Sequence, residues 1–133
     1  MTWKTGSETD TTFYEVLQKI KLHHKNKGQI FVGTDSLVNG SCCTFITSIV
    51  LLGAAGQKGG IYFYNKEKYN EPTRFYNRIL REVEKSINLA IRITEVCPNV
   101  NLEIHIDVSP EGKNERTSDM ARTLMGYATG SGF

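Results

Sequence analysis

QIFVGTDS, at residues 29–36, is a short apolar run with a carboxylate near its end. NLEIHIDV, at residues 101–108, repeats this pattern later in the chain. A carboxylate among β-branched residues is costly to bury unless a partner or a metal ion compensates its charge. Asp35 and Asp107, each at the far end of its predicted strand, therefore suggest one shared cation site.

The sequence around these two strands predicts a mixed α/β sheet with flanking helices. Helical spacing of apolar residues predicts helices over about 12–25, about 72–95 and 116–128. Short turns join strands at 29–36, 42–52 and from 61 onward, which predicts an antiparallel meander. The long helix then returns strand 101–108 parallel to strand 29–36. Numbered along the chain, the four strands are expected in the order 3-2-1-4.

Asp35 and Asp107 fall at the switch point of this sheet, where ligands of open α/β sheets bind. Their hard oxygen ligands suit Mg²⁺ or Mn²⁺. Glu82 and Glu84 flank the apolar stripe of the long helix on opposite sides. Helical geometry alone does not choose between these two as a third ligand, and Asp119 is a candidate fourth.

Such a carboxylate cluster can hold two ions about 3.5–4 Å apart and support phosphodiester hydrolysis without a covalent enzyme intermediate. His105 is a candidate for proton transfer. Lys113 and Arg116 are candidates for contacting a substrate phosphate. Each of these residues also has a purely structural interpretation, as a turn former, an exposed ion pair or part of a solvated loop.

The composition describes an ordinary globular protein of 133 residues with a net charge of +2, so no strong overall field attracts polyanions. We expect a flexible segment at 1–10 and a single domain at 11–133. The three cysteines form no metal-binding pair and are expected to be free thiols. Without a signal peptide or an apolar span, the chain is expected to be cytoplasmic and to contact no membrane.

The motifs FVGTDS (31–36), REVEKS (81–86), HIDVSP (105–110) and GYATGSGF (126–133) resemble those of the YkuK-like family of predicted ribonuclease H-like nucleases. This resemblance implies a ribonuclease H-like sheet and a nucleic-acid partner. It also implies that Asp35, Glu82 and Asp107 bind the metal, which favours Glu82 over Glu84.

The sequence departs from the family after its glycine-rich segment, which in the family leads into another strand and a further acidic motif. Because this sequence stops at Phe133, we expect a sheet without that last strand. The strand at 101–108 would then be an exposed edge that a homodimer could cover.

The function favoured by these features is a Mg²⁺- or Mn²⁺-dependent nuclease acting on RNA, DNA or a hybrid. The alternative is a catalytically weak or inactive nucleic-acid-binding or assembly module with the same fold. A small-molecule phosphohydrolase is a third candidate.

Overall fold

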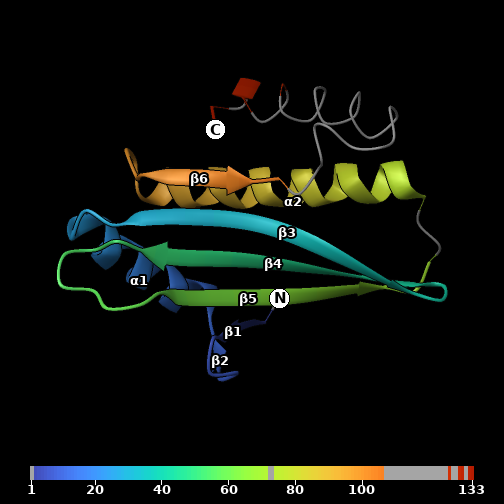
Figure 1. The fold of residues 1–133 in the computed structure, drawn as a ribbon, viewed down its shortest axis with the longest axis horizontal. Helices are drawn as coiled ribbons and strands as arrows, with labels where there is room; N and C mark the ends of the chain where they lie inside the picture. The colour runs from blue at the N-terminus through green and yellow to red at the C-terminus, as the bar shows by residue number, and fades with distance from the viewer. Residues whose placement is uncertain (1, 72–73, 107–125, 127–128, 131) are drawn as a thin grey trace.

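The structure is a computed structural model, and it describes residues 2–71, 74–106, 126, 129–130 and 132–133. Within these residues the chain forms one six-stranded sheet and two long helices (Figure 1). The elements are β1 (Trp3–Thr5), β2 (Asp10–Thr11), α1 (Phe13–Lys25), β3 (Gln29–Asn39), β4 (Cys42–Leu52), β5 (Ile61–Tyr69), α2 (Phe75–Val96) and β6 (Leu102–His105).

The strand order is β2-β1-β5-β4-β3-β6. β3, β4 and β5 form the predicted antiparallel meander, and β6 pairs parallel to β3, so the order expected for the four predicted strands is confirmed. β3 is longer than predicted, because its ladder with β4 continues as far as the pair Asn39 and Cys42. Asp35 therefore lies inside a strand and not at its end, which corrects the prediction.

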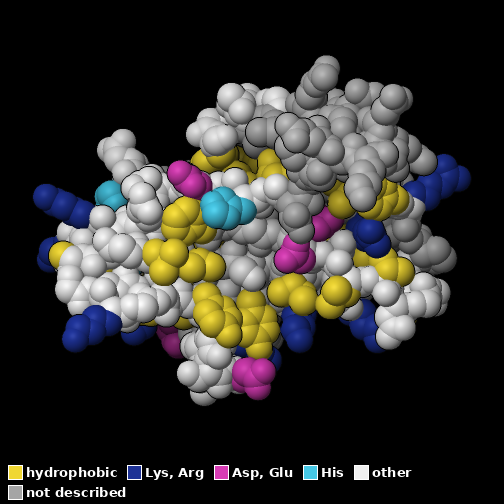
Figure 2. Space-filling model, in the orientation of Figure 1, with side chains coloured by type: hydrophobic (Ala, Val, Ile, Leu, Met, Phe, Trp, Pro, Cys, Tyr) yellow, Lys and Arg dark blue, Asp and Glu magenta, His cyan; other side chains and the backbone are white. Residues whose placement is uncertain are grey.

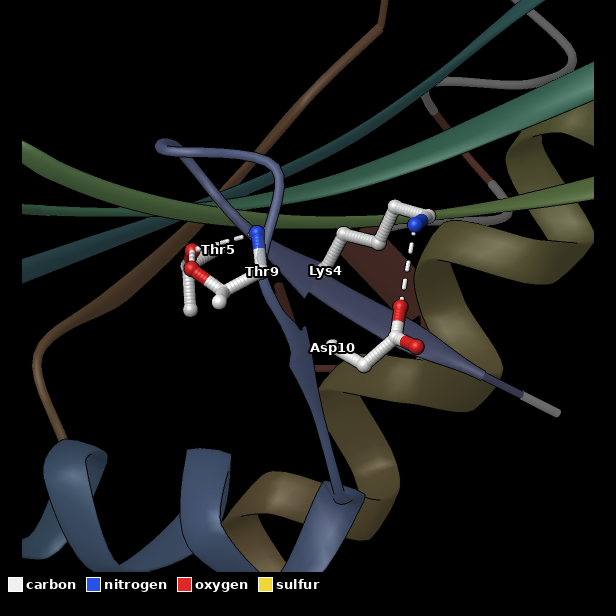
Figure 3. Close-up of polar contacts among 4 residues, drawn as sticks. All are labelled: Lys4, Thr5, Thr9 and Asp10. Atoms are coloured by element: carbon white, nitrogen blue, oxygen red, sulfur yellow. Dashed lines mark hydrogen bonds and ion pairs between the residues drawn. The ribbon is translucent and has the colours of Figure 1, made fainter.

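The first ten residues were predicted to be a flexible segment, and the structure places residues 3–5 and 10 in β-strands. β1 pairs with β5 and with β2, which extends the sheet by two strands. Figure 3 shows the polar contacts of this hairpin: Lys4 Nζ lies 2.9 Å from Asp10 Oδ1, and the hydroxyl of Thr5 lies 2.9 Å from that of Thr9. The side chain of Trp3 is only 2% exposed, so the segment is anchored by burial of an aromatic ring that the sequence analysis left unassigned.

α1 begins at Phe13, close to the predicted start of this helix, and Thr12 is its N-cap. The side chain of Thr12 accepts a hydrogen bond from the backbone N–H of Glu15, which satisfies one of the unpaired donors of the first turn. At the other end, His23 is buried, and its Nε2–H donates to the carbonyls of Gln29 and Leu52, each at 2.9 Å. The histidine thereby ties the end of α1 to both β3 and β4.

α2 lies over β3 and is fastened to β5 by a partly buried ion pair. Lys85 Nζ lies 2.9 Å from Glu67 Oε2 and donates to the hydroxyl of Tyr69 at 3.2 Å. These contacts join α2 to β5 on the side of the helix that packs against the sheet.

Among the described residues, α1 and α2 pack on the same face of the sheet, which we call the helix face (Figure 1). The main core cluster lies between this face and the two helices, and its buried members are Trp3, Val16, Ile20, Ile30, Val32, Ile49, Leu51, Phe63, Leu89 and Ile93. Because side chains alternate along a strand, the neighbours of the core residues point to the opposite side. We call that side the open face.

Three further predictions concern the rest of the chain. The helix expected over 116–128 lies outside the described residues apart from residue 126. Cys42, Cys43 and Cys97 are free thiols, as expected. Neither described helix is long and apolar enough to cross a membrane.

Candidate functional site at the end of β6

Asp35 lies on the open face of β3, opposite Ile46 of β4. Its side chain is exposed, whereas the adjacent Thr34 is buried on the helix face. Asp35 lines a groove of about 620 Å³ on the open face. The other residues around this groove are Phe31, Val32, Gly33, Thr34, Ile46, Ser48, Val50, Ile104, His105 and Ile106. The aspartate is therefore an accessible carboxylate in a depression with both polar and apolar lining.

Glu82 approaches from the other side of the sheet. It is 9% exposed and lies on the inner side of α2, between the core residues Ile79 and Val83 and the buried Ser86. It lines a small cavity that also contains Thr34, His105 and Ile106. Glu84, two residues along the same helix, is exposed. The structure therefore distinguishes the buried Glu82 from the exposed Glu84, which the helical periodicity alone did not.

The groove beside Asp35 and the cavity beside Glu82 share Thr34, His105 and Ile106 among their lining residues. These shared residues lie where the β3–β6 ladder ends, at the pair Gly33 and His105. Asp35 and Glu82 therefore approach the same end of β6 from the two faces of the sheet.

A buried hydrogen-bond chain holds α2 against β3 at this point. The hydroxyl of Thr34 lies 2.8 Å from that of Ser86 and 3.3 Å from that of Thr47. Ser86 is one helical turn after Glu82 and therefore lies on the same side of α2. Because buried hydroxyls without partners are costly, these contacts favour one position of α2 relative to β3.

His105 and Glu103 are both exposed on the open face, as strand alternation requires of residues two apart. His105 Nε2 lies 3.6 Å from Glu103 Oε2, and its ring lies 4.9 Å from that of Phe31. The imidazole is accessible to solvent at the rim of the groove.

The remaining candidate site residues, Asp107, Lys113, Arg116 and Asp119, lie outside the described residues. Within residues 2–71 and 74–106 and the few described positions beyond them, no group of three or more His, Cys, Asp and Glu side chains could hold a metal ion. Asp35 and Glu82 are the members of the predicted site that the structure describes.

Three features of this region were not predicted: the face that each side chain of β5 occupies, the contact between Thr34 and Ser86, and the place of Gly33 and Ser48 in the groove. Only the first has a local pattern in the sequence. The alternation in IYFYNKEKY of β5 places Tyr62, Tyr64, Lys66 and Lys68 on one face, opposite the buried Phe63. The pairing of Thr34 with Ser86, and the roles of Gly33 and Ser48 in the groove, depend on strand register, which no local pattern in the sequence gives.

Comparison with known proteins identifies the family to which the sequence belongs. No curated protein and no solved structure matches the chain. A family model described as ribonuclease H-like matches residues 11–133, which is most of the sequence. The chain belongs to the ribonuclease H-like family.

Proposed function

We propose that the protein is a Mg²⁺- or Mn²⁺-dependent nuclease that hydrolyses phosphodiester bonds, with Asp35, Glu82 and Asp107 as its metal-binding carboxylates. The observation that supports this most directly is the position of Ile106, which lines both the Asp35 groove and the Glu82 cavity. Asp107 follows Ile106 in the chain.

The donor chemistry of these residues fits a hard divalent cation. Asp35 offers an accessible carboxylate, and Glu82 offers a carboxylate held on the inner side of a fixed helix. Carboxylate oxygens are the protein ligands that Mg²⁺ and Mn²⁺ prefer. When bound, such an ion activates water and stabilises the charge that develops on the phosphate oxygens.

The chain itself would supply position and proton transfer. The Thr34–Ser86 contact fixes the turn of α2 that carries Glu82, so the carboxylate needs little reorganisation. His105 is exposed at the groove rim and can accept or release a proton during hydrolysis. Lys113 and Arg116 remain proposals for phosphate contacts, and Asp119 for a fourth metal ligand.

The test is cleavage of end-labelled single strands, duplexes and RNA–DNA hybrids by the purified full chain, with Mg²⁺, Mn²⁺ or EDTA. We expect metal-dependent cleavage that Asp35→Asn, Glu82→Gln and Asp107→Asn each lower by roughly 100-fold or more, the scale typical of groups that stabilise a transition state electrostatically. Glu84→Gln is the matched control, because it changes an exposed glutamate on the same helix. It should retain full activity.

Full activity in an Asp35→Asn, Asp107→Asn double variant with an unchanged far-UV spectrum would reject the proposal. If the wild type cleaves no substrate with either ion but still binds nucleic acid, the alternative of a binding or assembly module replaces it. Free nucleotides tested beside the oligonucleotides identify a small-molecule phosphohydrolase.

A further inference from the structure

Strand register arranges the side chains of the open face in rows that cross the strands. The central row contains His105, Gly33, Ser48 and Tyr64. The row on one side contains Glu103, Phe31, Val50 and Tyr62. The row on the other side contains Asp35, Ile46 and Lys66. Small side chains in the middle of the central row leave a trough between two taller rows.

The trough is the Asp35 groove, and it runs across the sheet. Phe31 and Asp35, on its two sides, are four residues apart on one strand, so their Cα atoms are separated by about 13 Å. A Cβ added to Gly33 would meet its nearest atom, the carbonyl oxygen of His105, at 3.4 Å, an ordinary contact. The absence of a side chain at Gly33 therefore keeps the groove open and is not required by backbone packing.

Aromatic and basic side chains of β5 extend these rows on the strand next to β4. The rings of Tyr62 and Tyr64 lie 6.3 Å apart and are inclined by 29°, and the ammonium group of Lys66 lies 5.8 Å from the Tyr64 ring centre. Among the described residues, Lys66 and Lys68 form no ion pair. Figure 2 shows apolar side chains gathered over the middle of this face, with acidic and basic side chains beside them.

We propose that this groove binds one unpaired strand of nucleic acid, and that the substrate of the proposed nuclease is therefore single-stranded. Bases of an unpaired strand can stack on Tyr64 and Phe31, while Lys66 faces the phosphates. In a duplex the bases are already stacked on one another and do not offer their faces to these rings. The strand would pass Asp35, so binding and cleavage would share one groove.

The statement that the bound nucleic acid is cleaved rests on the proposed function. The test of binding does not depend on hydrolysis. Binding is measured by fluorescence anisotropy in EDTA, with a labelled oligothymidylate of about 12 nucleotides and with the corresponding blunt duplex. We expect the single strand to bind more tightly than the duplex. Tyr64→Ala should weaken its binding about tenfold, the scale of one stacked base. Lys66→Ala should reduce the salt dependence of binding by about one phosphate contact.

Matched controls come from α1, on the helix face of the sheet. Tyr14→Ala removes a tyrosine that is 70% exposed, and Lys19→Ala removes an exposed lysine, so both should bind like the wild type. Gly33→Leu should block the groove, whereas Gly33→Ala should not. Far-UV spectra establish that both Gly33 variants fold, and Tyr64→Ala tests the groove independently.

Unchanged binding by Tyr64→Ala and by a folded Gly33→Leu would contradict the proposal that the groove binds single-stranded nucleic acid. Tighter binding of the duplex would also contradict it. Selective single-strand binding that these variants lower would support the groove even if the wild type hydrolyses nothing. In that case the proposed nuclease function would fail alone. Asp35→Asn is expected to bind the strand in EDTA at least as well as the wild type, because it removes a negative charge from the groove.

Discussion

Replacing Gly28 with alanine should destabilise the protein, although the same substitution usually stabilises. The backbone at Gly28 does not have the positive φ angle that favours glycine, so alanine there would ordinarily gain about 0.4–1 kcal/mol by restricting the unfolded chain. However, the new Cβ would overlap the ring of His23, which is only 6% exposed and already donates two hydrogen bonds. The ring must move, and both hydrogen bonds must lengthen or break.

The expected loss follows from these contacts. The bifurcated hydrogen bond from Nε2–H at about 1 kcal/mol, together with about 1 kcal/mol for each of two carbonyls left without this donor, outweighs the entropic gain. We expect Gly28→Ala to lower the free energy of unfolding by about 2 kcal/mol, or roughly 5–10 °C in Tm for a chain of this size. Urea and thermal unfolding followed by far-UV circular dichroism measure both quantities.

A double-mutant cycle separates the steric cause from any other. In a His23→Ala background the ring is absent, so Gly28→Ala should be neutral or slightly stabilising, which gives a coupling energy of about 2 kcal/mol between the two positions. A stabilising Gly28→Ala in the wild type, or equal destabilisation in both backgrounds, would refute this reasoning.

Other regions of the structure support three further predictions. Burial raises the pKa of the Cys97 thiol, so alkylation of Cys97 should be slower than that of the more accessible Cys42 at neutral pH and should accelerate only at higher pH, as mass spectrometry of the labelled peptides would show. Trp3→Ala should cost about 3–5 kcal/mol, measured by denaturant unfolding with circular dichroism, since the ring is almost fully buried. The hydrogen bond to Asp10 raises the pKa of Lys4 above its ordinary value of 10.5, so the small stabilisation from this exposed pair should be present below that pH and disappear as the pH rises through the folded-state pKa. Comparing the Tm of the wild type with that of Lys4→Met across this range measures the change.

Much of the sheet could be predicted from the sequence because its connections are short and its signals are local. The short turn between β3 and β4 contains Asn39-Gly40, a dipeptide typical of hairpins, and Gly40 has a φ of +62°. The single long helix between β5 and β6 required a parallel return beside β3. In contrast, β1 and β2 have three and two residues, too few for a periodic pattern, and they are stable because Trp3 is buried by distant parts of the chain.

The candidate site was less predictable, because its position depends on which face each side chain occupies. The prediction placed Asp35 at the end of a strand, since Asp35 and Ser36 look like a polar terminus. The strand instead continues for four residues beyond Asp35, as the polar and apolar residues of the hairpin pair with β4. The helix carboxylate could not be chosen from periodicity, because Glu82 and Glu84 both border the apolar stripe. In the structure, Glu82 lies among the buried residues of α2 and faces the sheet, whereas Glu84 is exposed.

The two described acids lie on opposite faces of the sheet, and the unequal lengths of β3 and β6 explain how they could act together. Thr34 and Asp35 are adjacent on β3, so one points toward α2 and Glu82 while the other points into the open groove. Through Gly33, β3 has strand neighbours on both sides. Beyond Gly33, the described ladder with β6 has ended, and only β4 remains paired to β3. A continuous β6 would separate the two carboxylates by a layer of backbone. Because β6 ends at His105, Ile106 lines both the Asp35 groove and the Glu82 cavity. The point at which β6 ends is therefore where a ligand could reach an acid from each face, and Asp107 is the next residue in the chain.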